Sequence, residues 1–125
     1  MEKEEKVVYK CKWFDLVEKG DHTGIRTFQD SVLILPFISD DMGLPLMVGV
    51  LNERNYFRNG GYSISVISGS PEDEDPNILS TAQRELLEET GFNVKDEDRW
   101  YFLGTLTGSK FVDSVHPCFG VDITG

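Results

Sequence analysis

Cysteine, histidine and positive charge are all scarce in this sequence. Its 125 residues include two cysteines, two histidines and 12 lysines or arginines, against 22 aspartates or glutamates, so the formal net charge is −10. Two cysteines in strand-like apolar runs, Cys11 and Cys118, exclude a disulfide scaffold and favour a reducing cytoplasm. The histidines, His22 and His116, have no metal-ligand spacing. A surface this acidic repels phosphate backbones, so long nucleic acids and anionic membranes are not expected partners.

Long hydrophobic runs are absent as well. No apolar stretch approaches the length needed to cross a membrane, and the charged first residues are unlike a signal peptide. A chain of this length can bury roughly two-thirds of its unfolded surface in one core. We therefore expect a single cytoplasmic domain that spans residues 1–125.

Hydrophobic alternation predicts six strand regions around one helical segment. The strands are expected over residues 7–17, 27–39, 46–51, 62–68, 100–107 and 115–123, and the helix over residues 78–90. The second and third strands should form a hairpin across a loop at 40–45. Pro36 indicates an edge strand or a bulge, because proline cannot donate to a strand ladder. Strands around a single helix predict an α+β fold, with the helix packed against a mixed sheet.

The helical segment carries three carboxylates on one side. It contains no glycine or proline and is followed by Gly91, where a helix normally ends. Residues three and four apart share a helix face, so Glu85, Glu88 and Glu89 project together, away from an apolar stripe. Mg²⁺ and Mn²⁺ take carboxylate oxygens and keep positions open for water and phosphates. This face is therefore either a metal site or the solvated acidic surface of an ordinary amphipathic helix.

A longer pattern favours the metal site. Residues 84–92 read R-E-L-L-E-E-T-G-F, which resembles the second half of the Nudix hydrolase signature, G-x5-E-x7-R-E-U-x-E-E-x-G-U, where U is bulky and aliphatic or aromatic. In the first half, Gly69 is followed after five residues by Asp75 in place of Glu, and eight residues instead of seven separate Asp75 from Arg84. Asp75 followed by Pro76 also fits a helix N-cap and a first-turn proline. Asp75 is thus either a helix cap or the partner of Arg84.

The resemblance implies a Nudix fold, which is an α/β/α sandwich with the carboxylate helix on one face. The family usually covers the other face with a helix after the last strands, and the sequence reaches Gly125 without one, so we expect that helix to be missing. The implied activity is Mg²⁺- or Mn²⁺-dependent hydrolysis of a nucleoside diphosphate linked to another moiety. By resemblance, the metal ligands are three helix carboxylates and one backbone carbonyl, from Glu85, Glu88, Glu89 and Gly69.

The resemblance also implies supporting groups and a general base. Arg84 would hold the carboxylates in place, so Arg84 and Glu85 are both assigned to catalysis. A base must activate the attacking water, and some family members place an acid on the loop between the last two strands. Asp113 occupies that loop and is the predicted base; alternatively it is a plain loop aspartate, and one of the helix glutamates is the base.

A second, looser resemblance concerns the substrate. Residues 30–37 and 48–58 are similar to the strand-turn-strand-arginine segment of ADP-ribose and nucleotide-sugar pyrophosphatases. It implies phosphate contacts from Arg54 or Arg58 and a nucleotide base stacked on Tyr56 or its aromatic neighbour. Alternatively, the arginines are solvated and the aromatic side chains cover the sheet. Members of that type often pair, so a homodimer is expected.

Two classes of function therefore remain for the sequence. The first is a metal-dependent hydrolase of a small nucleotide, either of the ADP-ribose or nucleotide-sugar type or a nucleoside triphosphate pyrophosphohydrolase. The second is a catalytically silent Nudix-fold module that binds a nucleotide without cleaving it, which the irregular first half of the signature and the missing helix favour. Metal-dependent turnover discriminates between them.

Overall fold

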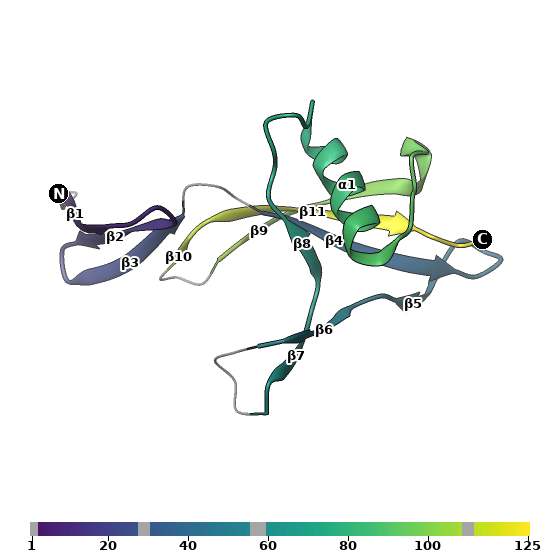
Figure 1. Ribbon diagram of the computed structural model, residues 1–125, viewed down its shortest axis with the longest axis horizontal. Coiled ribbons are helices and arrows are strands. Elements are labelled where there is room, and N and C mark those ends of the chain that lie inside the picture. Colours follow the sequence, from purple (N-terminus) through teal and green to yellow (C-terminus); the bar gives the residue numbers. More distant parts are fainter. Residues whose placement is uncertain (1–2, 28–30, 56–59, 109–111) are drawn as a thin grey trace.

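The computed structural model describes residues 3–27, 31–55, 60–108 and 112–125. Its strands are β1 (Glu5–Lys10), β2 (Phe14–Lys19), β3 (His22–Thr27), β4 (Val32–Ser39), β5 (Pro45–Val48), β6 (Leu51–Arg54), β7 (Tyr62–Ser65), β8 (Ile67–Gly69), β9 (Trp100–Thr107), β10 (Val112–Asp113) and β11 (Val115–Asp122). The α-helix is α1 (Ile78–Thr90), and a 3-10 helix, η1 (Glu97–Arg99), precedes β9. In Figure 1, α1 lies on one side of the central strands and the hairpin β6–β7 projects on the other. The predicted α+β class is confirmed.

Five strands form the central sheet, and β4 is in its middle. The strand order is β5-β4-β11-β9, and β8 also pairs with β4. Strands β4 and β11 run parallel, whereas the other pairs are antiparallel, so the sheet is mixed as predicted. Alternate residues of β4 are buried from Val32 onward, which shows that one face of the strand meets the core.

Pro36 was predicted on an edge strand or at a bulge; it lies in this central strand, which excludes the edge position. Strand β8 pairs with β4 as far as Ile34, and β5 pairs with it from Phe37 onward, so Pro36 falls in the gap between the two partners. The Pro36 carbonyl accepts a hydrogen bond from Gly49 N at 2.7 Å, just beyond β5. Neither β5 nor β8 pairs with β4 at Pro36, so no carbonyl of these strands needs the N–H that proline lacks. The strand tolerates proline for this reason.

Three of the predicted strands are each divided in two. Residues 7–17 form the antiparallel pair β1 and β2 around a bend at 12–13, residues 46–51 divide between β5 and β6, and residues 62–68 divide between β7 and β8. The predicted half burial of residues 7–17 is wrong for β1, which is exposed along its whole length, whereas residues 14–17 of β2 are partly buried. The alternation of apolar and polar residues in β1 therefore does not mark a face that packs on the core.

A second sheet joins the central one through β10. Its order is β1-β2-β3-β10, and β10 pairs in parallel with β3. Arg26 in β3 reinforces this junction, since its Nε donates to Asp113 Oδ2 at 2.8 Å while its Nη1 forms an ion pair with Glu5. Figure 1 shows this second sheet at the side of the central sheet, away from α1.

The core lies between α1 and one face of the central sheet. Its buried apolar members are Val32, Ile34, Ile67, Ala82, Leu86, Trp100, Phe119 and Val121. The opposite face of the sheet carries a hollow of about 420 Å³ with an apolar lining that includes Leu35, Phe37 and Leu103. The described residues therefore place a helical layer on one face of this sheet. Within the same residues, no helix is long and apolar enough to cross a membrane.

Candidate active site

Local signals determine where α1 begins and ends. Asn77 is the N-cap, since its Oδ1 accepts a hydrogen bond from Ser80 N at 2.9 Å. Gly91 follows the last helical residue with φ 81, a left-handed conformation that favours glycine, and its N–H donates to Leu87 O at 2.9 Å. The predicted bounds, 78–90, are confirmed because both signals are short-range.

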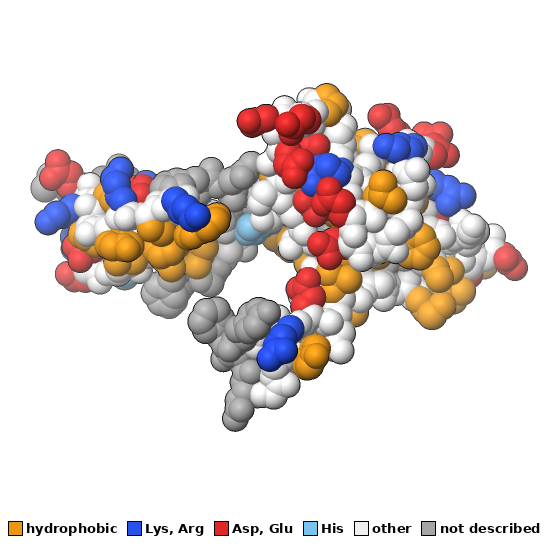
Figure 2. All heavy atoms as spheres, in the orientation of Figure 1, with side chains coloured by type: hydrophobic (Ala, Val, Ile, Leu, Met, Phe, Trp, Pro, Cys, Tyr) orange, Lys and Arg blue, Asp and Glu red, His pale blue; other side chains and the backbone are white. Residues whose placement is uncertain are grey.

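The three glutamates of α1 lie at different depths. Glu85 is buried, with 9% of its surface exposed, whereas Glu88 and Glu89 are exposed. On the core side of the same helix, Ala82 and Leu86 are fully buried. Figure 2 shows a line of acidic side chains down this face of the molecule, with a basic group among them. The carboxylates therefore extend from solvent to the edge of the core.

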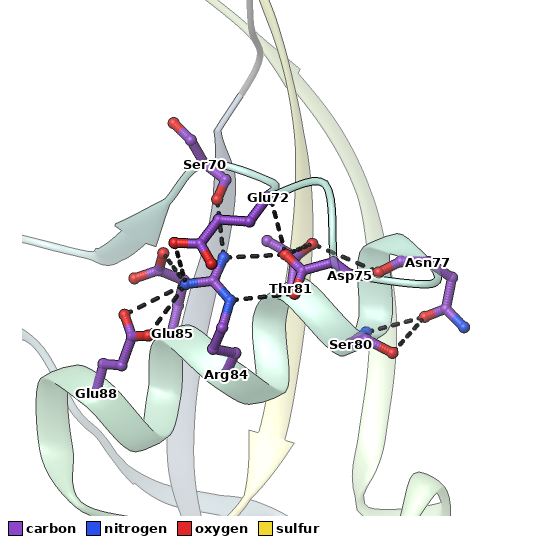
Figure 3. Close-up of polar contacts among 9 residues, drawn as sticks. All are labelled: Ser70, Glu72, Asp75, Asn77, Ser80, Thr81, Arg84, Glu85 and Glu88. Carbon is purple, nitrogen blue, oxygen red and sulfur yellow. Dashed lines mark hydrogen bonds and ion pairs between the residues drawn. The ribbon is translucent and has the colours of Figure 1, made fainter.

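The guanidinium of Arg84 lies at the centre of this acidic group (Figure 3). Its Nε and Nη2 donate to the two oxygens of Asp75 at 3.1 and 3.0 Å, which is a two-pronged ion pair. Nη2 also donates to Ser70 O at 2.9 Å. Nη1 donates to Glu85 Oε1 at 3.0 Å and to Glu88 Oε1 at 3.2 Å. One guanidinium thus joins the loop before α1 to two carboxylates on the helix.

Asp75 is the partner of Arg84 and not the helix cap, which is Asn77. Besides the ion pair, Asp75 Oδ2 accepts hydrogen bonds from Glu72 N at 2.9 Å and from Thr81 Oγ1 at 2.8 Å. The Arg84 guanidinium and the Glu72 N–H hold the pKa of Asp75 well below its usual range. The geometry therefore decides between the two interpretations of Asp75 that the sequence allows.

Glu85 packs against the backbone of Gly69. A Cβ atom at Gly69 would overlap the Glu85 carboxyl group, so any other residue at position 69 would displace this carboxylate from its place. Burial raises the pKa of Glu85, Arg84 opposes that rise, and the charges of Glu88 and Glu89 add to it. The net rise in pKa means that the negative charge of Glu85 is only partly compensated by its surroundings.

The chemistry of this group fits a hard divalent cation. Its side-chain acceptors are carboxylate oxygens, which Mg²⁺ and Mn²⁺ prefer. A further positive charge beside Glu85 would be favourable, because its surroundings compensate its negative charge only in part. Glu85 and Glu88 already face one common cationic atom, Arg84 Nη1. Across the described residues, no three acidic, histidine or cysteine side chains are close enough together to hold a metal ion. The donors are suitable, and binding an ion requires them to converge further.

Asp113, the predicted general base, lies in β10. Its carboxylate accepts the hydrogen bond from Arg26 Nε at 2.8 Å, and its side chain is 62% exposed. Figure 1 shows β10 at the junction with the second sheet, apart from α1. The structure therefore does not bring Asp113 together with the carboxylates of the helix.

The predicted substrate residues belong to the hairpin β6–β7 and its tip. Arg54 is the exposed last residue of β6, paired with Tyr62 of β7. Tyr56 and Arg58 lie outside the described residues. In Figure 1 this hairpin and α1 lie on opposite sides of the central strands. The substrate contacts stay predictions.

Three neighbours of the ion pair were not predicted from the sequence. They are Ser70, Glu72, whose Oε1 is 3.5 Å from Arg84 Nη1, and Thr81, which is fully buried. Thr81 is the one that a sequence signal could have found. A threonine in the early turns of an amphipathic helix, on its buried side, needs a partner for its hydroxyl, and the nearest acid before the helix is Asp75.

The fold is shared with a hydrolase of known structure. Forty-six chains of solved structures match this one. One of them is the crystal structure of an ADP compounds hydrolase, with a TM-score of 0.68 and 19% sequence identity over 95% of this chain. This chain spans 64% of the length of that hydrolase chain. At this identity the likeness establishes the fold.

The family follows from the sequence match. The NUDIX domain matches residues 27–123, and the chain therefore belongs to the NUDIX family. The matched region takes in the central sheet and α1, and it leaves β1, β2 and all of β3 except Thr27 outside. No curated protein matches the sequence. The family predicted from residues 84–92 is confirmed.

Proposed function

We propose that this chain is a metal-dependent hydrolase that cleaves the diphosphate bond of a nucleoside diphosphate linked to another moiety. The observation that carries the proposal is the ordered acidic group on α1. Its buried member, Glu85, lies against Gly69, and a single guanidinium holds Glu85 and Glu88 side by side. Membership of the NUDIX family supports the same activity.

The proposed metal is Mg²⁺ or Mn²⁺, which when bound neutralises phosphate oxygens and lowers the pKa of a coordinated water. Its proposed ligands are the helix carboxylates and one backbone carbonyl, from Glu85, Glu88, Glu89 and Gly69. Arg84 orients Glu85 and Glu88 without acting as a ligand itself. Gly69 has a second role, because the absence of a side chain leaves space for the carboxyl group of Glu85.

Two candidates for the general base follow from the sequence, Asp113 and a glutamate of α1. The Asp113 carboxylate is bonded to Arg26 in the other sheet. Glu89 is solvent-exposed and lies one helical turn after Glu85, on the same face. A proton acceptor must lie within reach of the reacting water, and this requirement favours the helix glutamate over Asp113.

The proposed substrates are ADP-ribose or a nucleotide sugar. The structural likeness to an ADP compounds hydrolase supports this class, and Arg54 on the exposed end of β6 offers a contact for a phosphate. Arg58 and Tyr56 complete the proposed substrate contacts. A nucleoside triphosphate is the alternative substrate within the same activity.

A catalytically silent NUDIX-fold module that binds a nucleotide is the alternative function. The observation that favours it is the spread of the helix carboxylates, which do not converge into a metal site within the described residues. It differs from the enzyme in one measurable way, since a binding module has no metal-dependent turnover.

Release of phosphate or nucleotide from a panel of substrates tests the proposal. The panel contains ADP-ribose, nucleotide sugars, dinucleoside polyphosphates and nucleoside triphosphates, each with Mg²⁺ and with a chelator. Glu89→Gln should abolish turnover with little loss of stability, because its exposed carboxylate does not contribute to packing. Glu97→Gln, an exposed acid of η1 away from the acidic group, is the matched control and should keep wild-type turnover. Chelator-insensitive or absent cleavage by the folded protein would move the assignment to the binding module.

We also propose that the protein forms a homodimer in the cytoplasm and acts on a small nucleotide. Strand β1 is exposed along its length, so the second sheet offers an uncovered surface to another copy. Both cysteines are free thiols, which suits a reducing compartment. Light scattering on the purified chain should give twice its mass of 14.1 kDa. A mass equal to one chain at micromolar concentration would contradict the dimer.

A further inference from the structure

Thr81 is a buried polar residue beside the acidic group, and no part of the NUDIX signature includes it. Its side chain has no exposed surface, and few other polar side chains among the described residues are buried. Its hydroxyl is 2.8 Å from Asp75 Oδ2 and 3.4 Å from Asn77 O. The shorter contact, to an ionised acceptor, is the stronger hydrogen bond. The hydroxyl is thereby committed to the one acid that pairs with Arg84.

Asp75 is held from three directions. Its Oδ2 accepts from Thr81 Oγ1, from Glu72 N at 2.9 Å and from Arg84 Nη2 at 3.0 Å, and its Oδ1 accepts from Arg84 Nε at 3.1 Å. Glu72 belongs to the same loop as Asp75, so its hydrogen bond does not connect the carboxylate to the helix. Thr81 belongs to α1, so its hydrogen bond is the contact, other than the ion pair itself, that ties the carboxylate to the helix.

The orientation of the guanidinium follows from this attachment. Two nitrogens of Arg84 are fixed by the plane of the Asp75 carboxylate, and a guanidinium is planar and rigid. Its third nitrogen, Nη1, is then aimed along the helix at Glu85 and Glu88. Figure 3 shows an unbroken chain of contacts from Thr81 through Asp75 and Arg84 to Glu85 and Glu88. A change in the tilt of Asp75 should therefore reach both helix carboxylates.

We propose that Thr81 is a positioning residue for the metal-binding carboxylates, which it orients through Asp75 and Arg84. This inference rests on the proposed function of the same site. It also explains how the shorter acid is accommodated at position 75. The sequence has Asp where the NUDIX signature has Glu, with one additional residue before Arg84, and the helix hydroxyl draws the shorter side chain toward the guanidinium.

Three substitutions separate positioning from packing. Thr81→Val removes the hydroxyl and keeps the shape, Thr81→Ser keeps the hydroxyl, and Thr90→Val removes another hydroxyl of α1, which bonds to Leu86 O at 2.6 Å. If Thr81→Val fails to fold, Thr81→Ala removes the same hydroxyl in a residue that favours helix. The melting temperature of each variant reports whether it is folded.

The first readout is the dissociation constant of Mn²⁺ alone, measured by the loss of the free-ion electron paramagnetic resonance signal. Thr81→Val should weaken Mn²⁺ binding by about tenfold, which is the low end of the effect of losing an outer-shell partner of a metal site. The dissociation constants of Thr81→Ser and Thr90→Val should stay within about twofold of wild type. A folded Thr81→Val protein with the wild-type dissociation constant would overturn the proposal.

The second readout needs no metal. The Arg84 Nε–H signal in ¹H–¹⁵N spectra should be sharp in the wild type and in Thr81→Ser, and shifted or broadened in Thr81→Val. An unchanged signal in Thr81→Val means that the hydroxyl does not hold the ion pair, and the proposal fails. A wild-type protein that binds no Mn²⁺ would instead refute the metal site of the proposed function, and the Nε–H signal would still decide whether Thr81 holds Arg84.

Discussion

Two arginines in this molecule each join acids from separate segments, and they do so at different depths. Arg26 bonds to Glu5 of β1 and Asp113 of β10, and its side chain is 40% exposed while that of Asp113 is 62% exposed. Arg84 bonds to Asp75 and to two glutamates of α1, and the exposures of Arg84 and Asp75 are 21% and 9%. The molecule therefore has one arginine–carboxylate cluster in solvent and another beside the core.

The difference in depth separates two uses of an ion pair. Exposed pairs gain little free energy, because water and salt screen them and two long side chains must be ordered. Arg26 thus links strands of an exposed sheet at small benefit to stability. A half-buried pair has fixed geometry and loses much when one partner is removed. The pair of Arg84 and Asp75 can therefore orient other groups, which a solvated pair cannot do.

The largest effect is expected from Glu85→Gln. Turnover should fall by more than about 100-fold, because removal of even an outer-shell partner of a metal site costs about 10- to 100-fold and Glu85 is a proposed ligand. Stability should be unchanged or slightly higher, since the raised pKa of Glu85 shows that burial disfavours its charge. Initial rates and thermal melts of the same preparation test both parts. Near wild-type turnover would exclude Glu85 from the site.

The next effect compares the two arginines directly. Arg84→Met should lower the melting temperature by about 5 to 10 °C, because it leaves Asp75 and Glu85 without their cation near the core. Arg26→Met should lower it by no more than about 3 °C, and that small difference should shrink further in high salt. Equal losses in the two variants would remove the distinction drawn between them.

A smaller effect is expected from pH. The folded-state pKa of Asp75 is depressed by Arg84 from its ordinary value of 3.8, so the folded protein binds a proton there less readily than the unfolded chain. The pair therefore stabilises the fold above that ordinary value and loses its contribution as the pH falls below it. The melting-temperature difference between wild type and Asp75→Asn should be constant from about pH 8 to 5 and should begin to narrow as the pH falls below about 4. A difference that widens on acidification would contradict the depressed pKa.

The smallest effect is expected from Asp113→Asn. The carboxylate lies in the exposed pair with Arg26, so turnover should stay within about threefold of wild type, below the range typical for loss of a general base. Arg26→Met serves as the control, since it disrupts the same pair without touching the acid. A loss of about 100-fold in Asp113→Asn alone would restore Asp113 as the general base.

The sequence predicted best what depends on neighbouring residues. The bounds of α1 and of β9 agree with the prediction; for α1 this is because a run without glycine or proline and a closing glycine act within a few positions. The strand at 7–17 was wrong because alternation alone cannot distinguish one half-buried strand from an exposed strand and a partly buried one with a bend between them. Exposure depends on what other segments cover, which the pattern does not contain.

The candidate site shows the same limit. Arg84 and the glutamates of α1 are recognisable because their spacing follows the helix. The partner of Arg84 was ambiguous, since the path of the loop from Gly69 to Asn77 decides whether Asp75 caps the helix or turns back to the guanidinium. The positions of Asp113 and Thr81 depend on long-range pairing of β10 with β3 and on the rotation of α1 against the sheet. Neither position can be predicted from the spacing of neighbouring residues.

The gap at Pro36 has a consequence for the placement of the hairpin β6–β7 relative to α1. The chain leaves β4 through β5 on one side of Pro36, forms the hairpin β6–β7, and returns through β8 on the other side, from which it runs directly to Gly69 and α1. The hairpin that bears Arg54 thus leaves β4 at the gap, between Phe37 and Ile34, whereas the run to the carboxylate helix leaves it at the other end of β8, opposite Val32. The three residues of β8 therefore set how far apart the hairpin and the run to α1 leave β4, so an insertion in β8 would shift one against the other.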